Sequence, residues 1–291
     1  MSELFDSDFL NKIQKLTLST GIIVSGGAGG NRKSRQKGSS VEFSDYREYS
    51  EGDDFRRIDW NAYGRFEKLY VKLFMEEREA PVNIFLDTSK SMDWGEPNKS
   101  FASRRLAAAL GYMSLSAYDR VSVICLSDRV EKSRLSLRGK HFLPELLTFL
   151  EEVEYKNGPG FYEAIKAYNL KDNRGISIII SDLFSPGGLT EMIKYLQYRK
   201  QDVYICQILA PWEARPDIGT NMRLVDSETG RTIDVTATPR LLKSYNRIFN
   251  DFIANIREEC FRKGAAYYMM DTAMPIEQMI SMITGLNKVR S

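Results

Sequence analysis

The sequence predicts an α/β protein built on a doubly wound, mostly parallel sheet, with a β-rich N-terminal extension and an inserted β-hairpin. Apolar runs of strand length at 82–86, 121–126 and 176–180 alternate with stretches of helical periodicity, which is the pattern of a parallel sheet with helical crossovers. The runs are almost wholly apolar, as is typical of strands covered on both faces. Connections between such strands are expected to be right-handed.

The other predicted elements follow in the same order along the chain. Apolar residues three and four positions apart predict a helix over 5–18, and Ser100 is expected to cap the helix after the first core strand. Near 222–235, two strand-like runs around a Glu-Thr-Gly turn predict a hairpin inserted at the margin of the sheet. The remaining predicted helices are 143–150, 161–168, 189–198, about 240–262 and one after Pro275, with strands at 203–209 and 266–270.

A change of composition near residue 80 divides the chain into an N-terminal segment, 1–80, and an α/β domain, 81–291. Residues 25–40 combine glycine and serine with four basic side chains and very little apolar area, which predicts a flexible surface loop. Residues 41–80 interleave aromatic and charged side chains in short bursts. This pattern predicts short strands and turns, with one alternating apolar face at 69–73.

The composition is that of a folded globular protein. Hydrophobic residues make up 43% of the chain and charged residues 27%, and 41 Lys and Arg against 39 Asp and Glu leave a formal charge of +2. These values exclude a disordered or a collagen-like chain. The mixed charges offer no broad basic face, so we expect no nucleic-acid partner.

The cysteines and the apolar runs indicate the compartment. Cys125, Cys206 and Cys260 are far apart, without the CxxC spacing of a zinc site, so we expect buried free thiols and a reducing compartment. The N-terminus lacks the pattern of a signal peptide, and no apolar run approaches the roughly 20 residues of a membrane span. The sequence therefore predicts a cytoplasmic protein without a membrane span.

Polar residues follow two of the predicted strands directly. Asp87, Ser89 and Ser91 come after the strand at 82–86, and Asp182 comes after the strand at 176–180. Ligands of open parallel sheets bind at the carboxyl ends of the strands. Carboxylate and hydroxyl oxygens suit Mg²⁺, whereas in the simpler interpretation Asp87 and Ser89 only cap the next helix.

These strand ends resemble a known family of domains. The DxSxS run at 87–91 and the Ser-Asp pair at 181–182 resemble the metal-ion-dependent adhesion site of von Willebrand factor A (vWA) domains. The resemblance implies a vWA-like fold with Mg²⁺, or alternatively Mn²⁺ or Ca²⁺, at Asp87, Ser89, Ser91 and Asp182. The family's middle loop usually contains a threonine that is missing from residues 157–164. The site is therefore expected to bind the ion weakly, to replace the threonine by water, or to be empty.

A second, longer motif lies just before the predicted α/β domain. The run FSDYREYSEGDDFRRIDWNAYGR at 43–65 resembles the signature of the bacterial domain-of-unknown-function family 58 (DUF58). Together the two resemblances cover about residues 41–209, and that family implies a MoxR-type AAA+ ATPase as partner. The signature residues are Asp45, Arg47, Tyr49, Gly52, Asp53, Asp54, Arg56, Asp59 and Trp60.

The charged and aromatic residues of the signature allow two interpretations. In the structural one, pairs between carboxylates and arginines pin the segment to the sheet domain, with Trp60 as a buried anchor. In the other, Arg56 and Trp60 belong to a partner-binding surface, because Trp, Tyr and Arg are enriched at interface hot spots.

The function expected from the sequence is that of a non-catalytic adaptor or scaffold, in which a carboxylate of the partner completes the coordination of the metal. The single histidine, His141, lies in an apolar context without a G-x-S-x-G elbow. The glycine-rich loop is no Walker motif, because Asn31 and Arg32 precede Lys33. The alternatives are a metal-dependent hydrolase that uses the same carboxylates and a metal-free adaptor with a degenerate site. We expect no small-molecule substrate.

Overall fold

The computed structural model divides the chain into two compact units. Met1–Ala28 and Ala80–Ser291 form one, here called the sheet unit, and Gly29–Glu79 form the other, the signature unit. The structure describes residues 3–20, 42–75, 81–156, 158, 160–171, 173–185, 187–216, 222–225, 232–236 and 238–285. The predicted flexible loop at 25–40 lies outside these residues.

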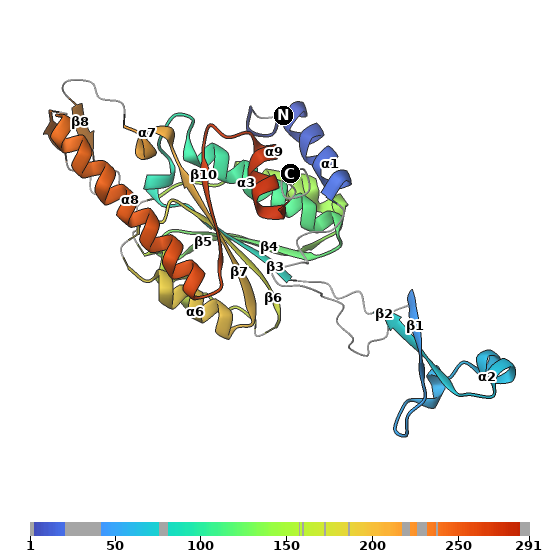
Figure 1. The fold of residues 1–291 in the computed structure, drawn as a ribbon. Helices are drawn as coiled ribbons and strands as arrows, with labels where there is room; N and C mark the ends of the chain where they lie inside the picture. The colour runs from blue at the N-terminus through green and yellow to red at the C-terminus, as the bar shows by residue number, and fades with distance from the viewer. Residues whose placement is uncertain are drawn as a thin grey trace. The chain divides into compact units, whose positions relative to one another are not determined.

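A six-stranded sheet forms the centre of the sheet unit, in the order β10-β7-β6-β3-β4-β5 (Figure 1). Five of its strands run parallel, and only β5 runs antiparallel to its neighbour. The sheet confirms the predicted doubly wound α/β class, although the sequence did not predict β5. The strands are β3 (Pro81–Asp87), β4 (Arg120–Leu126), β5 (Val130–Arg138), β6 (Gly175–Ser181), β7 (Gln201–Leu209) and β10 (Ala266–Asp271).

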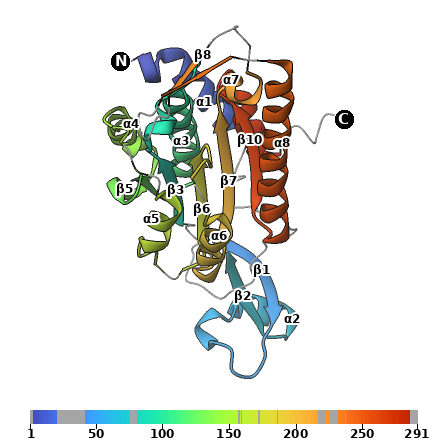
Figure 2. The same cartoon turned by 90° about the vertical axis from the view of Figure 1, so that its left-hand side faces the viewer.

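Helices cover both faces of this sheet, as the two views show (Figures 1 and 2). Alternate residues of β3 point to opposite faces, so Ile84 and Leu86 join one core and Phe85 joins the other. The first core is covered by α1 (Ser7–Thr20), α3 (Lys99–Ser116), α4 (Leu143–Glu151) and α9 (Ile276–Thr284). The second is covered by α5 (Phe161–Ala167), α6 (Leu189–Tyr198) and α8 (Pro239–Arg262).

The N-terminal helix belongs to the sheet unit. Phe5, Phe9 and Ile13 are buried in the first core, and Arg105 of α3 donates a hydrogen bond to the carbonyl of Leu4 at 2.7 Å. This grouping differs from the division at residue 80 that composition suggests, because that division placed the helix with the N-terminal segment. A short 3-10 turn, η1 (Glu3–Phe5), precedes the helix.

The signature unit is a two-stranded antiparallel ribbon with a short helix. β1 (Glu42–Glu48) pairs with β2 (Tyr70–Met75), and η2 (Phe55–Arg57) and α2 (Trp60–Phe66) lie between them. The β-rich prediction for this segment therefore holds, but α2 was not predicted. The helix begins here because the side chain of Asp59 accepts hydrogen bonds from the amides of Asn61 and Ala62.

The remaining segments connect these elements. β8 (Met222–Val225) and β9 (Thr232–Val235) pair as the predicted hairpin and form a sheet of their own. The three cysteines are free and buried, as predicted. Among the described residues, no helix has the length and apolar character needed to cross a bilayer. The other short elements are η3 (Lys90–Met92), η4 (Lys140–Phe142) and α7 (Pro211–Ala214).

Candidate functional site

The candidate site lies at the carboxyl ends of β3 and β6. These strands are parallel neighbours in the middle of the sheet. From β3 the chain crosses through α3 to β4 on one side, and from β6 it crosses through α6 to β7 on the other. The strand order therefore reverses between β3 and β6, which is where ligands bind in doubly wound sheets.

The structure brings the four predicted strand-end residues to this point. Asp87 ends β3 and is fully buried, while Ser89 and Ser91 follow it with their hydroxyl oxygens 3.1 Å apart. Asp182 follows β6 and is also buried. The placement agrees with the sequence analysis, and the metal-binding role of these residues stays a prediction.

Hydrogen bonds from the chain hold both oxygens of Asp87. Its Oδ1 accepts from the amide of Ser89 at 2.9 Å, and its Oδ2 accepts from the hydroxyl of Ser181. Burial raises the pKa of Asp87 well above the ordinary value for aspartate, and the charge of Asp182 raises it further. The carboxylate lies in a dry environment in which each charge must be compensated.

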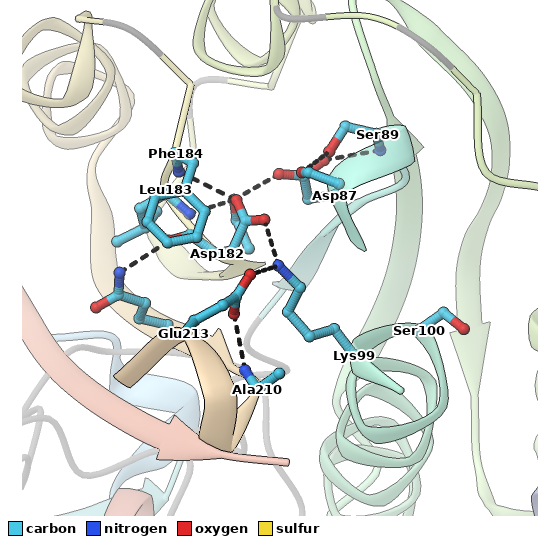
Figure 3. A network of polar contacts seen from close by, with 12 residues as sticks. Asp87, Ser89, Lys99, Ser100, Asp182, Leu183, Phe184, Ala210 and Glu213 are labelled. Carbon is cyan, nitrogen blue, oxygen red and sulfur yellow. Dashed lines mark hydrogen bonds and ion pairs between the residues drawn. The ribbon is translucent and has the colours of Figure 1, made fainter. Parts of the chain in front are cut away.

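Lys99 supplies the positive charge at this site. Its Nζ lies 2.9 Å from Oδ2 of Asp182 and 2.6 Å from Oε1 of Glu213 (Figure 3). The Lys99 side chain is only 1% exposed, against 2% for Asp182 and 12% for Glu213. The second oxygens accept from backbone amides, Oδ1 of Asp182 from Phe184 at 3.0 Å and Oε2 of Glu213 from Ala210 at 2.8 Å.

These contacts keep Lys99 charged. Burial acts to lower its pKa, but the two carboxylates outweigh burial and the pKa is raised. Burial raises the pKa of Glu213, while the ammonium of Lys99 acts in the opposite direction. The three side chains form a buried ion triad with one cation and two carboxylates.

Aromatic rings surround the triad. The ammonium of Lys99 lies 5.4 Å from the ring centroid of Phe184 and 5.9 Å from that of Trp94, within the range of cation–π attraction. Trp94 packs edge-on against Trp212, and Phe184 stacks on Phe252 of α8. Because Trp94 is 43% and Phe184 42% exposed, these rings form an aromatic rim between the buried charges and the solvent.

The middle loop, where the family's threonine is missing, lies beside the turn after β3. The amide of Lys156 donates to the carbonyl of Thr88 at 2.9 Å. A Cβ at Gly158 would lie 2.8 Å from the amide nitrogen of Asp128, so only glycine fits there without a shift. Of the loop positions named above, Asn157 and Pro159 lie outside the described residues.

Two ion pairs of the signature residues lie within the signature unit. Arg47 donates to both carboxylate oxygens of Asp53 at 2.7 Å. Asp59 accepts from the hydroxyl of Tyr46 at 2.8 Å and pairs with Lys72 at 3.2 Å. These pairs hold the ribbon and the start of α2 together.

The other signature residues lie in turns or on the surface of the same unit. Asp54 caps η2 by accepting from the amide of Arg56, and Gly52 adopts a φ of 98° in the preceding turn. The amide of Tyr49 donates to the carbonyl of Leu69, and Asp45 pairs in register with Leu73. Trp60 is 63% exposed. The expected role of Trp60 as an anchor on the sheet domain stays a prediction.

The chain itself places hydrogen-bond donors and a cation at the carboxylates predicted as metal ligands. The carboxylates of Asp87 and Asp182 already accept a hydrogen bond on each oxygen, and a fixed ammonium touches Asp182. A second cation beside this ammonium would be repelled in a poorly screened environment. No group of three or more His, Cys, Asp or Glu side chains among the described residues could hold a metal ion.

Two residues of the site were not found by sequence reasoning. Lys99 lies in the first turn of α3, where the helix dipole disfavours a cation, and this unusual position was the available signal. Glu213 lies four residues after β7, another strand end at the same edge of the sheet. The sequence analysis also assigned the cap of α3 to Ser100, whereas the cap is Asn98, whose side chain accepts from the Ser100 amide.

Comparisons with known proteins agree with the signature in the sequence. Uncharacterised proteins of Mycobacterium tuberculosis and Mycobacterium bovis are each 24% identical over 217 residues, which cover 72% of this chain and 68% of theirs. The structure of a conserved hypothetical protein, BatB, from Bacteroides thetaiotaomicron matches 72% of this chain and 99% of its own, with 21% identity and a TM-score of 0.46.

A von Willebrand factor type A protein of Catenulispora acidiphila matches 48% of this chain and 35% of its own, with 14% identity and a TM-score of 0.34. The family model described as "Protein of unknown function DUF58" matches residues 45–251, which include the whole candidate site and most of the signature unit. The chain therefore belongs to the DUF58 family.

Proposed function

We propose that the chain is a non-catalytic protein-interaction module, an adaptor or scaffold, that binds its partner through exposed aromatic side chains of α2. Trp60, Tyr63 and Phe66 are 63%, 45% and 65% exposed, and this is the observation that supports the proposal. Their spacing of three places them on one side of the helix. Exposed aromatic side chains of this kind are enriched at interface hot spots.

The construction of the signature unit supports the same role. Its ribbon and helix are joined by Asp59, Tyr46 and Lys72 and by the pair between Arg47 and Asp53. The three aromatic side chains of α2 are therefore not needed to make these contacts. Phe66 also packs edge-on against Tyr70 of β2, but all three rings stay at least 45% exposed, and exposed apolar patches mark interaction sites.

The strand-end site supports a non-catalytic role. Asp87, Asp182 and Glu213 accept a hydrogen bond on every carboxylate oxygen from a donor of the chain. A general base needs an oxygen that can take a proton from a substrate. In this arrangement the carboxylates position neighbouring segments instead of activating water.

A MoxR-type AAA+ ATPase is the partner that the family resemblance implies, and we propose it as the partner of this chain. The test uses the purified full-length chain and a purified MoxR-type ATPase of the same organism, with affinity measured by biolayer interferometry in the presence of ATP. Trp60→Ala and Phe66→Ala are each expected to weaken binding at least about tenfold, as hot-spot residues do.

Phe261→Ala is the matched control, because Phe261 of α8 is an aromatic residue that is 84% exposed in the sheet unit. This variant is expected to bind as the unchanged chain does. Unchanged affinity of the two α2 variants would show that the partner binds elsewhere. No binding by the folded, unchanged chain would overturn the choice of partner.

A further inference from the structure

We infer that Lys99 is the resident cation of the strand-end site and that this site therefore needs no metal ion. The ammonium lies between Asp182 of the β6 end and Glu213 of α7, beside the turn that carries Asp87 (Figure 3). It provides from within the chain one positive charge, at the carboxylates of Asp182 and Glu213. This inference does not rest on the partner proposed above.

The burial of Lys99 requires these partners. Taking an ammonium out of water costs several kcal/mol unless close opposite charges compensate it. The N-terminal end of a helix adds to the cost, because the helix dipole is positive there. Two carboxylates at 2.9 and 2.6 Å and the faces of Phe184 and Trp94 supply the compensation.

Every carboxylate oxygen of the site has a hydrogen-bond donor from the chain. In Asp182 and in Glu213, one carboxylate oxygen accepts a hydrogen bond from the ammonium of Lys99 and the other accepts from a backbone amide. The oxygens of Asp87 accept hydrogen bonds from the Ser89 amide and the Ser181 hydroxyl. A metal ion at these oxygens would share them with donors of the chain, and it would lie next to the ammonium of Lys99, which repels a second cation.

The ammonium also joins three segments that are far apart in the sequence. It ties the start of α3 to the loop after β6, 83 positions away, and to α7, 114 positions away. Trp94, Phe184 and Trp212 of the aromatic rim lie on or next to these segments. Lys99 is therefore a positioning residue for the whole rim.

The first test is thermal unfolding of the full-length chain in EDTA, in millimolar Mg²⁺ and in millimolar Mn²⁺. The unchanged chain is expected to unfold at the same temperature in all three. A saturable rise with either ion that disappears in Asp87→Asn would overturn the inference, because it would place a metal at the predicted ligands.

The variant Lys99→Met tests how much the ammonium contributes to the stability of the chain. Two buried carboxylates lose their partner, so the melting temperature is expected to fall by about 10 °C. Lys132→Met is the matched control, because Lys132 pairs with Glu152 at 2.6 Å and the two side chains are 41% and 61% exposed. The control is expected to shift the melting temperature by less than about 2 °C, and an equally small shift for Lys99→Met would overturn the inference.

A double-mutant cycle with Glu213→Gln separates the charge interaction from packing. The double variant Lys99→Met with Glu213→Gln is expected to melt higher than the sum of the two single shifts predicts, because each change removes the other's uncompensated charge. Additive shifts would contradict a role for the ammonium as counter-ion. Should Lys99→Met fail to fold, crystals of the unchanged chain grown with Mn²⁺ decide, since an anomalous peak beside Asp87 and Ser89 would overturn the inference and its absence would support it.

Discussion

Thr88 directly follows Asp87, and its side chain differs from the carboxylates of the strand-end site in its hydrogen bonding. The hydroxyl of Thr88 is fully buried and has no hydrogen-bond partner within the described part of the chain. Its backbone is well held, since its amide donates to the carbonyl of Leu126 and its carbonyl accepts from Lys156. An unpaired buried hydroxyl costs about 1–3 kcal/mol relative to a paired one.

Thr88→Val is therefore expected to leave the free energy of unfolding unchanged or to raise it by up to about 1 kcal/mol. Ser177→Ala is the comparison, because the buried hydroxyl of Ser177 donates to Gln201 at 3.2 Å. That variant is expected to lose about 1 kcal/mol. Urea unfolding of both variants gives the two values, and a larger loss for Thr88→Val would show that its hydroxyl has a partner.

At the residue scale, the sequence was sufficient for part of the site. Asp87 and Asp182 were predictable because each directly follows an apolar strand, and the ends of parallel strands meet at one edge. Lys99 and Glu213 were not predicted, because their pairing joins positions 114 residues apart and neither lies directly after a strand. Only the packed fold shows that the cation of this site comes from the chain.

At the scale of elements, the middle loop shows how backbone contacts fix the site. Gly158→Ala would place a Cβ 2.8 Å from the backbone amide of Asp128, which cannot move without shifting the end of β4. This variant is expected to lose about 1–3 kcal/mol of the free energy of unfolding. At Gly111 of α3 the close contact of the added Cβ would be with Cδ2 of Leu146, the end of a side chain and not backbone, so Gly111→Ala is expected to lose less. Equal losses in urea unfolding would contradict this account.

The stability of the signature unit is expected to depend on pH through the carboxyl group of Asp59. The hydrogen bond from Tyr46 lowers the pKa of Asp59 to about 2; partial burial opposes this effect, and Lys72 and the α2 amides support it. Since the folded pKa lies below the unfolded value of about 3.9, the contribution of ionised Asp59 to stability is fully present above that value. It is lost as the pH falls through about 2.

The measurement is a carbon NMR titration of the Asp59 carboxyl, which is expected to have its midpoint near pH 2. Tyr46→Phe removes the hydroxyl that donates to Asp59 and is expected to move the midpoint upward. Lys68→Met, which removes an exposed pair with Glu48, is expected to leave it in place. A midpoint near 4 in the unchanged chain would refute the proposed contacts.

The elements missed by the sequence analysis have physical causes in common. β5 is an edge strand whose side chains are mostly exposed, so it lacks the continuous apolar run by which the other strands were found. α2 has only seven residues, none of them buried, and depends on the cap by Asp59 rather than on an apolar stripe. Elements that bury little leave little hydrophobic pattern in the sequence.

For the whole molecule, the apolar pattern predicted the sheet and its two layers of helices but not which unit the N-terminal helix joins. A change of composition can only divide the chain at a position in the sequence, whereas the unit to which a helix belongs is decided by its contacts in space. The helix α1 lies on the first core beside α3 and α9, and the signature unit follows it in the sequence. The contribution of α1 to stability is therefore a contribution to the sheet unit.

Phe9→Ala tests this grouping in the full-length chain. Phe9 is 1% exposed, packs 5.6 Å from the ring of Phe5 and lies under the guanidinium of Arg105 of α3. Its truncation leaves a cavity in the first core, so the sheet unit is expected to lose about 3–5 kcal/mol of the free energy of unfolding. Urea unfolding is followed by tryptophan fluorescence in a Trp60→Phe background, so that the signal comes from Trp94 and Trp212 of the sheet unit. Phe261→Ala, which removes an exposed ring, is expected to change the free energy of unfolding by less than about 0.5 kcal/mol. An unchanged unfolding transition for Phe9→Ala would place α1 with the N-terminal segment after all.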